Sequence, residues 1–196
     1  MYNRSDIPEE AKDKTVVIPL GYHWTLPNGS DDPLNKTPRL PFRNQTWSFF
    51  GTNWKNRKDL LAPLNNIQPN TLRLFDSWNS PDVVDRKQYI VTMLDTIFVP
   101  CPSGNNAETF RLYEALECGC IPLYVKEDGN NDEEYIQTLN KELGLIPLNN
   151  WKDAFVLMVH FLKEKELMEN YRNMLLSRWK AWKERLGASV RKIWML

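Results

Sequence analysis

The chain has 196 residues, of which 42% are hydrophobic and 26% are charged, and its formal net charge is zero. That length suits one domain, or one domain and part of a second, and the neutral balance does not favour nucleic acid as a partner. No apolar run is long enough to cross a bilayer, and residues 1–14 are too polar and charged to form a signal peptide.

The first part of the chain shows little regular periodicity. Residues 15–21 are a short apolar run closed by glycine, which predicts a strand or an extended connection. Residues 22–46 are rich in proline, asparagine and aspartate, and a loop of that length is often functional or a linker. We therefore expect residues 1–45 to be an extended lead-in or interdomain segment that precedes one domain over residues 46–196.

From residue 46 onward, short apolar runs alternate with helical patterns. The predicted strands are residues 46–51, 71–75, 96–100, 120–125 and 145–148, and the predicted helices are residues 56–64, 83–94, 108–116 and 132–143. Helices of this length between strands imply right-handed crossovers and a parallel sheet covered by helices on both faces. The predicted fold class is therefore α/β, with a Rossmann-like sheet.

Long helices are predicted from residue 151 to about residue 186. One helical stripe carries Leu167, Tyr171, Leu175, Trp179, Trp182 and Leu186, and basic residues lie around it. A basic, tryptophan-bearing amphipathic helix can lie on a membrane, or it can pack on the sheet or against a partner domain. The pattern allows both interpretations.

The three cysteines are Cys101, Cys118 and Cys120. An odd number without a Cys-x-x-Cys pair argues against a zinc site or a disulfide scaffold. Cys101 ends one predicted strand and Cys120 begins the next, so in parallel neighbours their sulfur atoms are separated by roughly 15–20 Å. We expect reduced, packed thiols.

Four Asn-x-Ser/Thr sequences begin at Asn3, Asn28, Asn35 and Asn44. They arise either by chance in an asparagine-rich chain or because the protein enters the lumen of the secretory pathway.

Three loops follow predicted strands and are expected to meet at one edge of the sheet. They are residues 51–57, 76–79 and 103–107. In an open parallel sheet, ligands bind beyond the carboxyl ends of the strands, at the point where the strand order reverses. These loops therefore define the expected ligand site.

The helix predicted to begin near Glu108 suits an anionic ligand. The free amide groups of its first turn favour an anion such as a diphosphate, and Gly104 allows a close approach of the backbone. Arg111 can hold phosphate oxygens, and Glu114, on the same helix face, can accept both hydroxyl protons of a ribose. The alternative is a surface ion pair between Arg111 and Glu114.

Two stretches resemble a known family. Cys101-Pro-Ser-Gly, Arg111-Leu-Tyr-Glu-Ala-Leu and Gly119-Cys-Ile-Pro resemble the donor-binding signature of exostosin-like glycosyltransferases, and Trp47-Ser-Phe-Phe-Gly with the nearby Arg57 resembles an earlier strand of that family. The resemblance runs from about residue 16 to residue 125. It implies a GT-B fold, in which the second of two Rossmann-like domains holds the nucleotide sugar. This chain resembles that second domain.

The resemblance also implies roles for particular residues. Arg57 and Arg111 would face the diphosphate, Ser103 and Gly104 would form the turn beside it, and Glu114 would hold the ribose. The expected nucleotide contacts are Asp76, Ser77, Asn105 and Thr109. Pro19, Gly21 and His23 would line the interdomain side of the cleft, with His23 a candidate general base.

The departures from related patterns refine this expectation. The chain lacks an Asp-x-Asp metal motif, which fits a metal-independent site without a cofactor. It also lacks a Glu-x7-Glu pair at the expected place, because Glu108 and Glu114 are six residues apart rather than eight. The second departure favours inversion over retention. The resemblance implies a glycan or protein acceptor, and an N-terminal acceptor domain of which this chain would lack most. The resemblance implies the location that is usual in this family, which is a membrane-anchored protein of the Golgi or endoplasmic reticulum lumen. The alternative location is the cytoplasm.

The sequence therefore predicts a glycosyltransferase donor domain. The alternative is a non-catalytic Rossmann-like domain that serves as a partner or scaffold. Dehydrogenase and P-loop activities are poorly supported, because the chain has neither a Gly-x-Gly-x-x-Gly fingerprint nor a Walker lysine loop.

Overall fold

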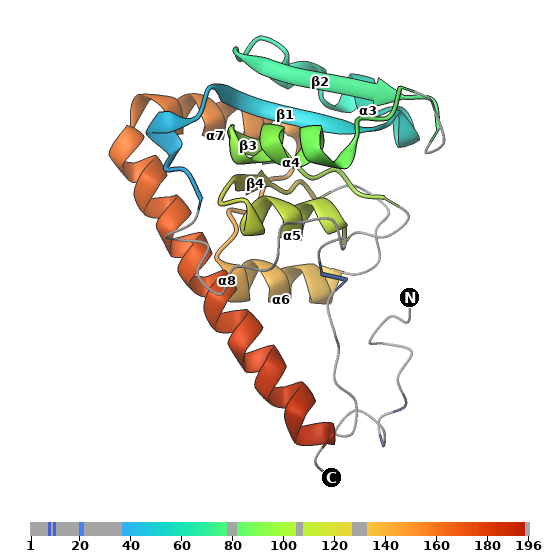
Figure 1. The fold of residues 1–196 in the computed structure, drawn as a ribbon, viewed down its shortest axis with the longest axis vertical. Coiled ribbons are helices and arrows are strands. Elements are labelled where there is room, and N and C mark those ends of the chain that lie inside the picture. Colours follow the sequence, from blue (N-terminus) through green and yellow to red (C-terminus); the bar gives the residue numbers. More distant parts are fainter. Residues whose placement is uncertain are drawn as a thin grey trace.

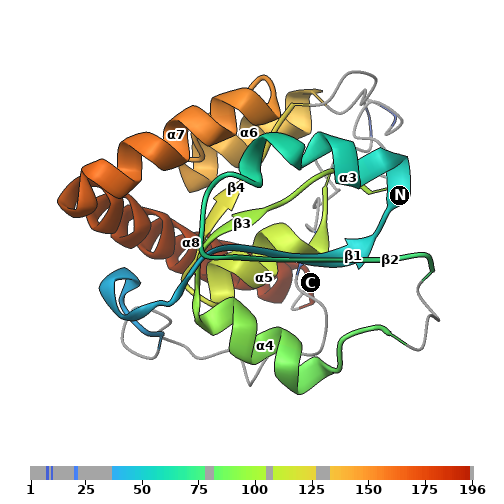
Figure 2. The ribbon, with the colours of Figure 1, turned by 90° about the horizontal axis from the view of Figure 1, so that it is seen from above.

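The protein contains an α/β layer structure, as the alternating pattern predicts. The computed structural model describes Pro8, Glu10, Leu20, Gly21 and residues 37–77, 82–104, 108–126 and 133–194. Figure 2 shows the sheet edge-on, with α3 and α7 on one side and α4 and α5 on the other.

The sheet has four parallel strands in the order β2-β1-β3-β4. They are β1 (Gln45–Thr52), β2 (Asn70–Phe75), β3 (Thr96–Pro100) and β4 (Ile121–Leu123). The two central strands, β1 and β3, are almost entirely buried, as strands covered on both faces are. The four corresponding predictions are confirmed.

The fifth predicted strand, residues 145–148, is wrong. Among the residues that the structure describes, the sheet continues on that side only as one isolated parallel bridge, between Val125 and Leu148. Pro147 has no amide hydrogen to give to a ladder, and the amide of Ile146 donates to the hydroxyl of Tyr171 at 3.0 Å. A side chain from a distant helix therefore replaces the strand pairing.

Two helices cover each face of the sheet. One face carries α4 (Arg86–Leu94) and α5 (Phe110–Glu117), and the other carries the short α3 (Arg57–Leu60) and α7 (Trp151–Lys163). The helix predicted over residues 56–64 is interrupted: after α3 the chain continues as the 3₁₀ turn η4 (Ala62–Leu64). Pro63 causes this break because it cannot donate the next helical hydrogen bond.

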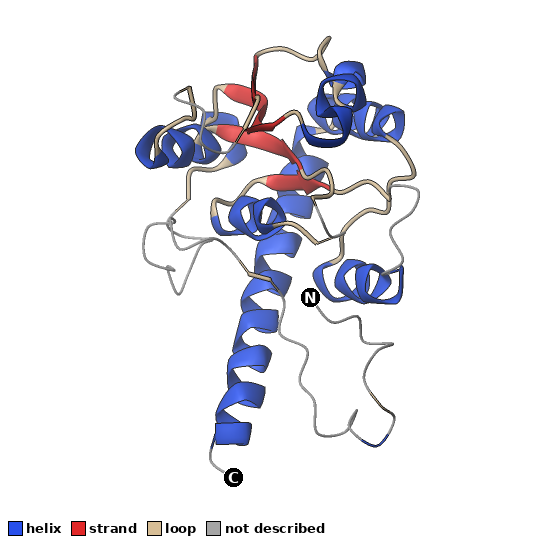
Figure 3. Ribbon diagram, turned by 90° about the vertical axis from the view of Figure 1, so that its right-hand side faces the viewer, coloured by secondary structure: helices blue, strands red, loops and turns tan. Residues whose placement is uncertain are grey.

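The remaining helices are α6 (Glu133–Leu143) and the 30-residue α8 (Lys165–Trp194). Figures 1 and 3 show α8 running along the domain and extending past it at its carboxyl end. Trp179 is buried and lies tilted against the ring of Tyr113 of α5, on which Trp182 stacks. The tryptophan stripe therefore packs within the domain. Leu167, which the predicted stripe places in the core, is 47% exposed, and the neighbouring Met168 is buried instead.

None of the helices described in the structure is both long enough and apolar enough to cross a membrane.

The prediction of reduced, packed thiols is confirmed. Cys101, Cys118 and Cys120 are free and buried. Cys101 follows β3 and Cys120 precedes β4, at opposite ends of two paired parallel strands. Burial raises the pKa of all three thiols above its ordinary value.

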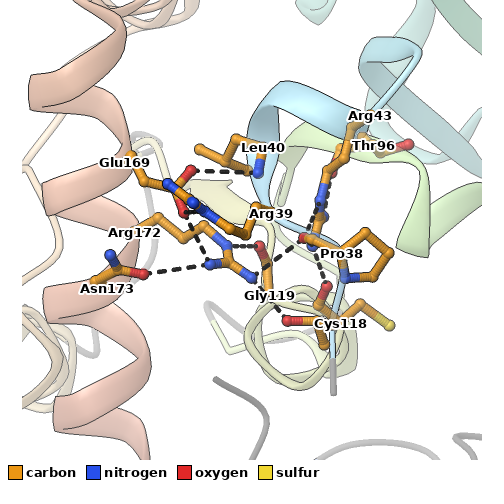
Figure 4. A network of polar contacts seen from close by, with 11 residues as sticks. Pro38, Arg39, Leu40, Arg43, Thr96, Cys118, Gly119, Glu169, Arg172 and Asn173 are labelled. Carbon is orange, nitrogen blue, oxygen red and sulfur yellow. Dashed lines mark hydrogen bonds and ion pairs between the residues drawn. The ribbon is translucent and has the colours of Figure 1, made fainter. Parts of the chain in front are cut away.

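The amino end of the sheet is tied to α8 by Arg172, which is 1% exposed (Figure 4). Its Nε donates to the carbonyl of Gly119 at 2.9 Å, and its Nη1 pairs with Glu169 at 3.2 Å. Its Nη2 donates to the hydroxyl of Thr37 at 2.7 Å and to the carbonyl of Pro38 at 3.3 Å. One guanidinium therefore joins three segments that are distant in sequence.

Arg43 completes this arrangement. Its guanidinium donates to the carbonyls of Thr96, Pro38 and Cys118, and to the sulfur of Cys120 at 3.3 Å. We call Arg43, Arg172, Glu169 and the backbone groups they bind the amino-edge network. It packs the segment that precedes β1, including the 3₁₀ turn η2 (Leu40–Phe42), against the sheet.

Candidate functional site

The candidate site is a cavity at the carboxyl ends of the strands. In the order β2-β1-β3-β4 the chain leaves β1 in one direction to β2 and then crosses back to β3, so the order reverses between β1 and β3. A cavity of about 620 Å³ lies at this end, and its lining residues are Thr52, Asn53, Trp54, Arg57, Asp76, Ser77 and Gly104. All three loops contribute to it. The structure thus brings together four of the predicted residues: Arg57, Asp76, Ser77 and Gly104.

Arg57 joins two of the loops. Its side chain is 5% exposed, and its Nη1 and Nη2 donate to the carbonyls of Thr52 at 3.2 Å and Ser103 at 3.0 Å. The first carbonyl ends β1 and the second belongs to the turn after β3. Arg57 therefore sets the separation of the two loops at the reversal point, and Ser103 contributes its backbone to that contact.

The loop after β1 has an unusual backbone. Lys55 and Asn56 both adopt left-handed conformations, with φ of 51° and 55°. Asparagine tolerates the left-handed region of backbone conformation, but a lysine side chain has no compensating local interaction there. The left-handed conformation costs roughly 1–2 kcal/mol per residue. The Nζ of Lys55 lies 3.5 Å from the hydroxyl of Ser103.

The sequence reasoning missed Lys55, as well as Thr52, Asn53 and Trp54 of the lining. Trp54 is half exposed beside the cavity. All four lie in the first predicted loop, residues 51–57, and their position in that loop is the sequence signal that could have identified them.

Arg111, on α5, approaches β1 at the same aromatic ring as Arg57. Its guanidinium carbon is 4.1 Å from the ring centroid of Phe49, and that of Arg57 is 5.6 Å from the same centroid. Arg111 also donates to the carbonyl of Phe50. A Cβ atom on Gly51 would meet the Phe49 ring at 3.1 Å and Arg111 at 3.3 Å, so glycine makes room for both groups. The two arginines assigned to the diphosphate therefore approach one aromatic ring.

Glu114 and Arg111 have separate partners. Glu114 is 6% exposed and accepts the hydroxyl of Tyr89 at 2.5 Å, from α4. Burial, together with the neighbouring Glu114 carboxylate, raises the pKa of Tyr89 well above its ordinary value. Both Arg111 and Glu114 are described, and no ion pair joins them, so the surface ion pair that the spacing allowed does not form. Neither residue is among those that line the cavity.

The amino end of α5 is partly capped by its own chain. The hydroxyl of Thr109 accepts the amide of Arg111 at 3.0 Å. Next to it, the buried Glu108 accepts the amide of Leu20 at 2.7 Å and the hydroxyl of Tyr113. The lead-in segment at Leu20 therefore reaches the start of this helix. Pro19, His23 and Asn105 lie outside the described residues.

Across the part of the chain that the structure describes, no three histidine, cysteine, aspartate or glutamate side chains are grouped as the ligands of a metal ion would be.

Comparison with known protein families identifies the domain. Residues 38–194 match the RXYLT1 C-terminal domain, a stretch that covers well over half of the chain and includes the whole sheet. The chain belongs to the RXYLT1 C-terminal domain family. This family is xylosyltransferase-related, so the domain is glycosyltransferase-related. The finer resemblance to exostosin-like enzymes stays an interpretation of the motifs. No curated protein matches the chain.

Proposed function

We propose that this domain binds the nucleotide-diphosphate sugar donor of a glycosyltransferase, which transfers the sugar to a glycan or protein acceptor. The observation that carries the proposal is the cavity at the reversal point between β1 and β3, where Arg57 and Gly104 meet. This is the position at which open parallel sheets hold nucleotides. The family adds a reason to test nucleotide-activated xylose first.

In this proposal the diphosphate lies beside the loops that carry Arg57, Ser103 and Gly104, with Arg111 next to Gly51. Glu114 holds the ribose hydroxyls. Its carboxylate already accepts a hydroxyl from Tyr89, and this contact fixes its orientation. The remaining nucleotide contacts are assigned to Asp76, Ser77, Asn105 and Thr109.

The proposed reaction is a direct displacement at the anomeric carbon, with inversion. The acceptor hydroxyl forms the new bond as the bond from the sugar to the diphosphate breaks, and the diphosphate leaves with both electrons. This domain positions the donor and stabilises the departing charge. Guanidinium groups take the role that a metal ion has in other enzymes, and no cofactor is required.

The rest of the catalytic apparatus is assigned outside the described residues. His23 is the candidate general base, and an N-terminal acceptor domain would complete the cleft. The proposed location is the lumen of the Golgi or endoplasmic reticulum, with a membrane anchor elsewhere in the full-length protein; the alternative is the cytoplasm.

Calorimetry with UDP, GDP, UDP-xylose and UDP-glucose tests this function. We expect one of the diphosphates to bind, and Arg111→Ala to weaken that binding by about 1.5–3 kcal/mol, the scale of a charge-assisted hydrogen bond. Arg178→Ala is the matched control, because Arg178 is an exposed arginine of α8 that donates to the carbonyl of Lys141. Equal affinity with and without Arg111 would contradict its role in binding.

A thermal-shift screen separates this function from a non-catalytic interaction domain. A ligand that binds only the folded state raises the melting temperature. Stabilisation by a nucleotide diphosphate supports donor binding, and no shift with any of the four compounds supports the interaction domain.

A further inference from the structure

The proposed function assigns Arg57 to the diphosphate, but its contacts differ from those of its neighbour Lys55. We propose that Lys55 makes the direct cationic contact to the diphosphate in this cavity, and that Arg57 is a positioning residue that holds the two loops around it. This inference rests on the proposed function for the identity of the ligand, a nucleoside diphosphate.

Arg57 directs its terminal nitrogens at the protein itself. Both Nη1 and Nη2 donate to backbone carbonyls, of Thr52 and Ser103, and the side chain is 5% exposed. These two bonds hold the guanidinium between the loops after β1 and β3. Arg57 is therefore suited to setting the shape of the cavity.

Lys55 has the opposite character. Its side chain is exposed, and its ammonium reaches across from the loop after β1 to the hydroxyl of Ser103 at 3.5 Å. The residue before it in the chain, Trp54, lines the cavity, and so does Gly104, the residue after Ser103. The ammonium forms no ion pair with any residue that the structure describes. It is a charged donor beside the cavity with one long contact to a neutral oxygen.

The backbone supplies the second argument. Lys55 has φ 51° and ψ 38°, and the left-handed Asn56 that follows is held by a 2.6 Å hydrogen bond from its side-chain amide to Asp59. Non-glycine residues in this region cluster at ligand sites, where the surrounding structure maintains the strain. Here the strained pair places the lysine at the reversal point of the sheet.

The test compares four variants: Lys55→Gln, Lys55→Arg, Lys55→Gly and Lys58→Gln. Lys58 is a matched control because it is an exposed lysine three residues away in α3. The probes are UDP, GDP and inorganic pyrophosphate, measured by calorimetry with the whole chain. We expect Lys55→Gln to weaken binding about tenfold, the loss of one charge-assisted hydrogen bond, and to reduce its dependence on salt. Lys55→Arg should retain most of the affinity, and Lys58→Gln should match the wild type.

Lys55→Gly separates binding from folding. Glycine adopts a positive φ without steric cost, so this variant should melt at or above the wild-type temperature while binding the probes as weakly as Lys55→Gln. Wild-type affinity in Lys55→Gln, or equal weakening in Lys58→Gln, would overturn the assignment of Lys55 and leave the proposed function standing.

Pyrophosphate distinguishes the remaining cases. If no nucleotide binds the wild type but pyrophosphate binds and Lys55→Gln loses it, the lysine site stands and the proposed function fails. If neither nucleotides nor pyrophosphate bind the wild type, both proposals fail.

Discussion

The two edges of the sheet each hold buried arginine, and they differ in what surrounds it. At the amino edge, Arg43 and Arg172 direct their donors at backbone carbonyls, side chains and Glu169. At the carboxyl edge, Arg57 also binds carbonyls, but a cavity opens beside it and an exposed, strained Lys55 lies next to it. A buried arginine therefore does not by itself indicate a ligand site. The cavity, the strained backbone and the exposed cation make that distinction.

The largest effect is expected at the amino edge. Arg172→Met removes bonds to Gly119, Thr37 and Pro38 and leaves Glu169 with a weaker set of partners, so the free energy of unfolding should fall by about 3–5 kcal/mol. Urea denaturation measures this loss. Arg178→Ala, an exposed arginine on the same helix, should change stability by no more than about 0.5 kcal/mol. A loss below about 1 kcal/mol for Arg172→Met would show that the network contributes little.

A substitution at Gly119 tests the packing of the same amino-edge network, because Gly119 lies against Thr37 and Arg172. Its φ is +65°, and a Cβ atom there would lie 2.5 Å from the Thr37 hydroxyl and 2.8 Å from Nη2 of Arg172. Gly119→Ala should therefore destabilise the protein by about 2–4 kcal/mol. Gly187→Ala in α8 is the control, because a Cβ atom there meets nothing closer than 3.6 Å, and it should stabilise the helix by about 0.5–1 kcal/mol. Similar effects at the two positions would contradict the close packing at Gly119.

A smaller effect separates Arg57 from Lys55. Arg57→Ala leaves the carbonyls of Thr52 and Ser103 without their guanidinium donor, so we expect a loss of about 1–3 kcal/mol in the free energy of unfolding. Lys55→Gln should change it by no more than about 0.5 kcal/mol, because its side chain is exposed. Chemical denaturation of both variants checks this order. The reverse order would mean that Lys55, rather than Arg57, holds the loops.

The smallest effect concerns pH. Burial raises the pKa of Cys118 above the ordinary value of 9.0, so the folded state holds this proton more tightly than the unfolded state does. The resulting stability is fully present well below pH 9 and is lost progressively as the pH rises above 9, because the unfolded chain then releases the thiol proton and the folded one keeps it. Urea midpoints from pH 7 to pH 10 should fall less steeply for Cys118→Ala. An identical slope would argue against a buried, protonated thiol.

Much of the fold could be predicted because its signals are local. The four strands follow from short apolar runs between helical patterns, and their parallel direction follows from the crossover helices. The absence of a strand over residues 145–148 could not be predicted from the sequence. The amide of Ile146 donates to the hydroxyl of Tyr171, 25 residues further along the chain. The run looked like a strand, and a tertiary contact decided otherwise.

For the site, the sequence by itself determined which loops meet, because the carboxyl ends of parallel strands share one edge of the sheet. It therefore led to Arg57, Asp76, Ser77 and Gly104. Only the tertiary structure decided the partners of Arg111 and Glu114, which are the carbonyl of Phe50, 61 residues away, and the hydroxyl of Tyr89, 25 residues away. It also decided the left-handed backbone at Lys55. The physical reason is that residue patterns encode which face of an element is buried, whereas hydrogen-bond partners and strained dihedrals depend on how separate elements pack together.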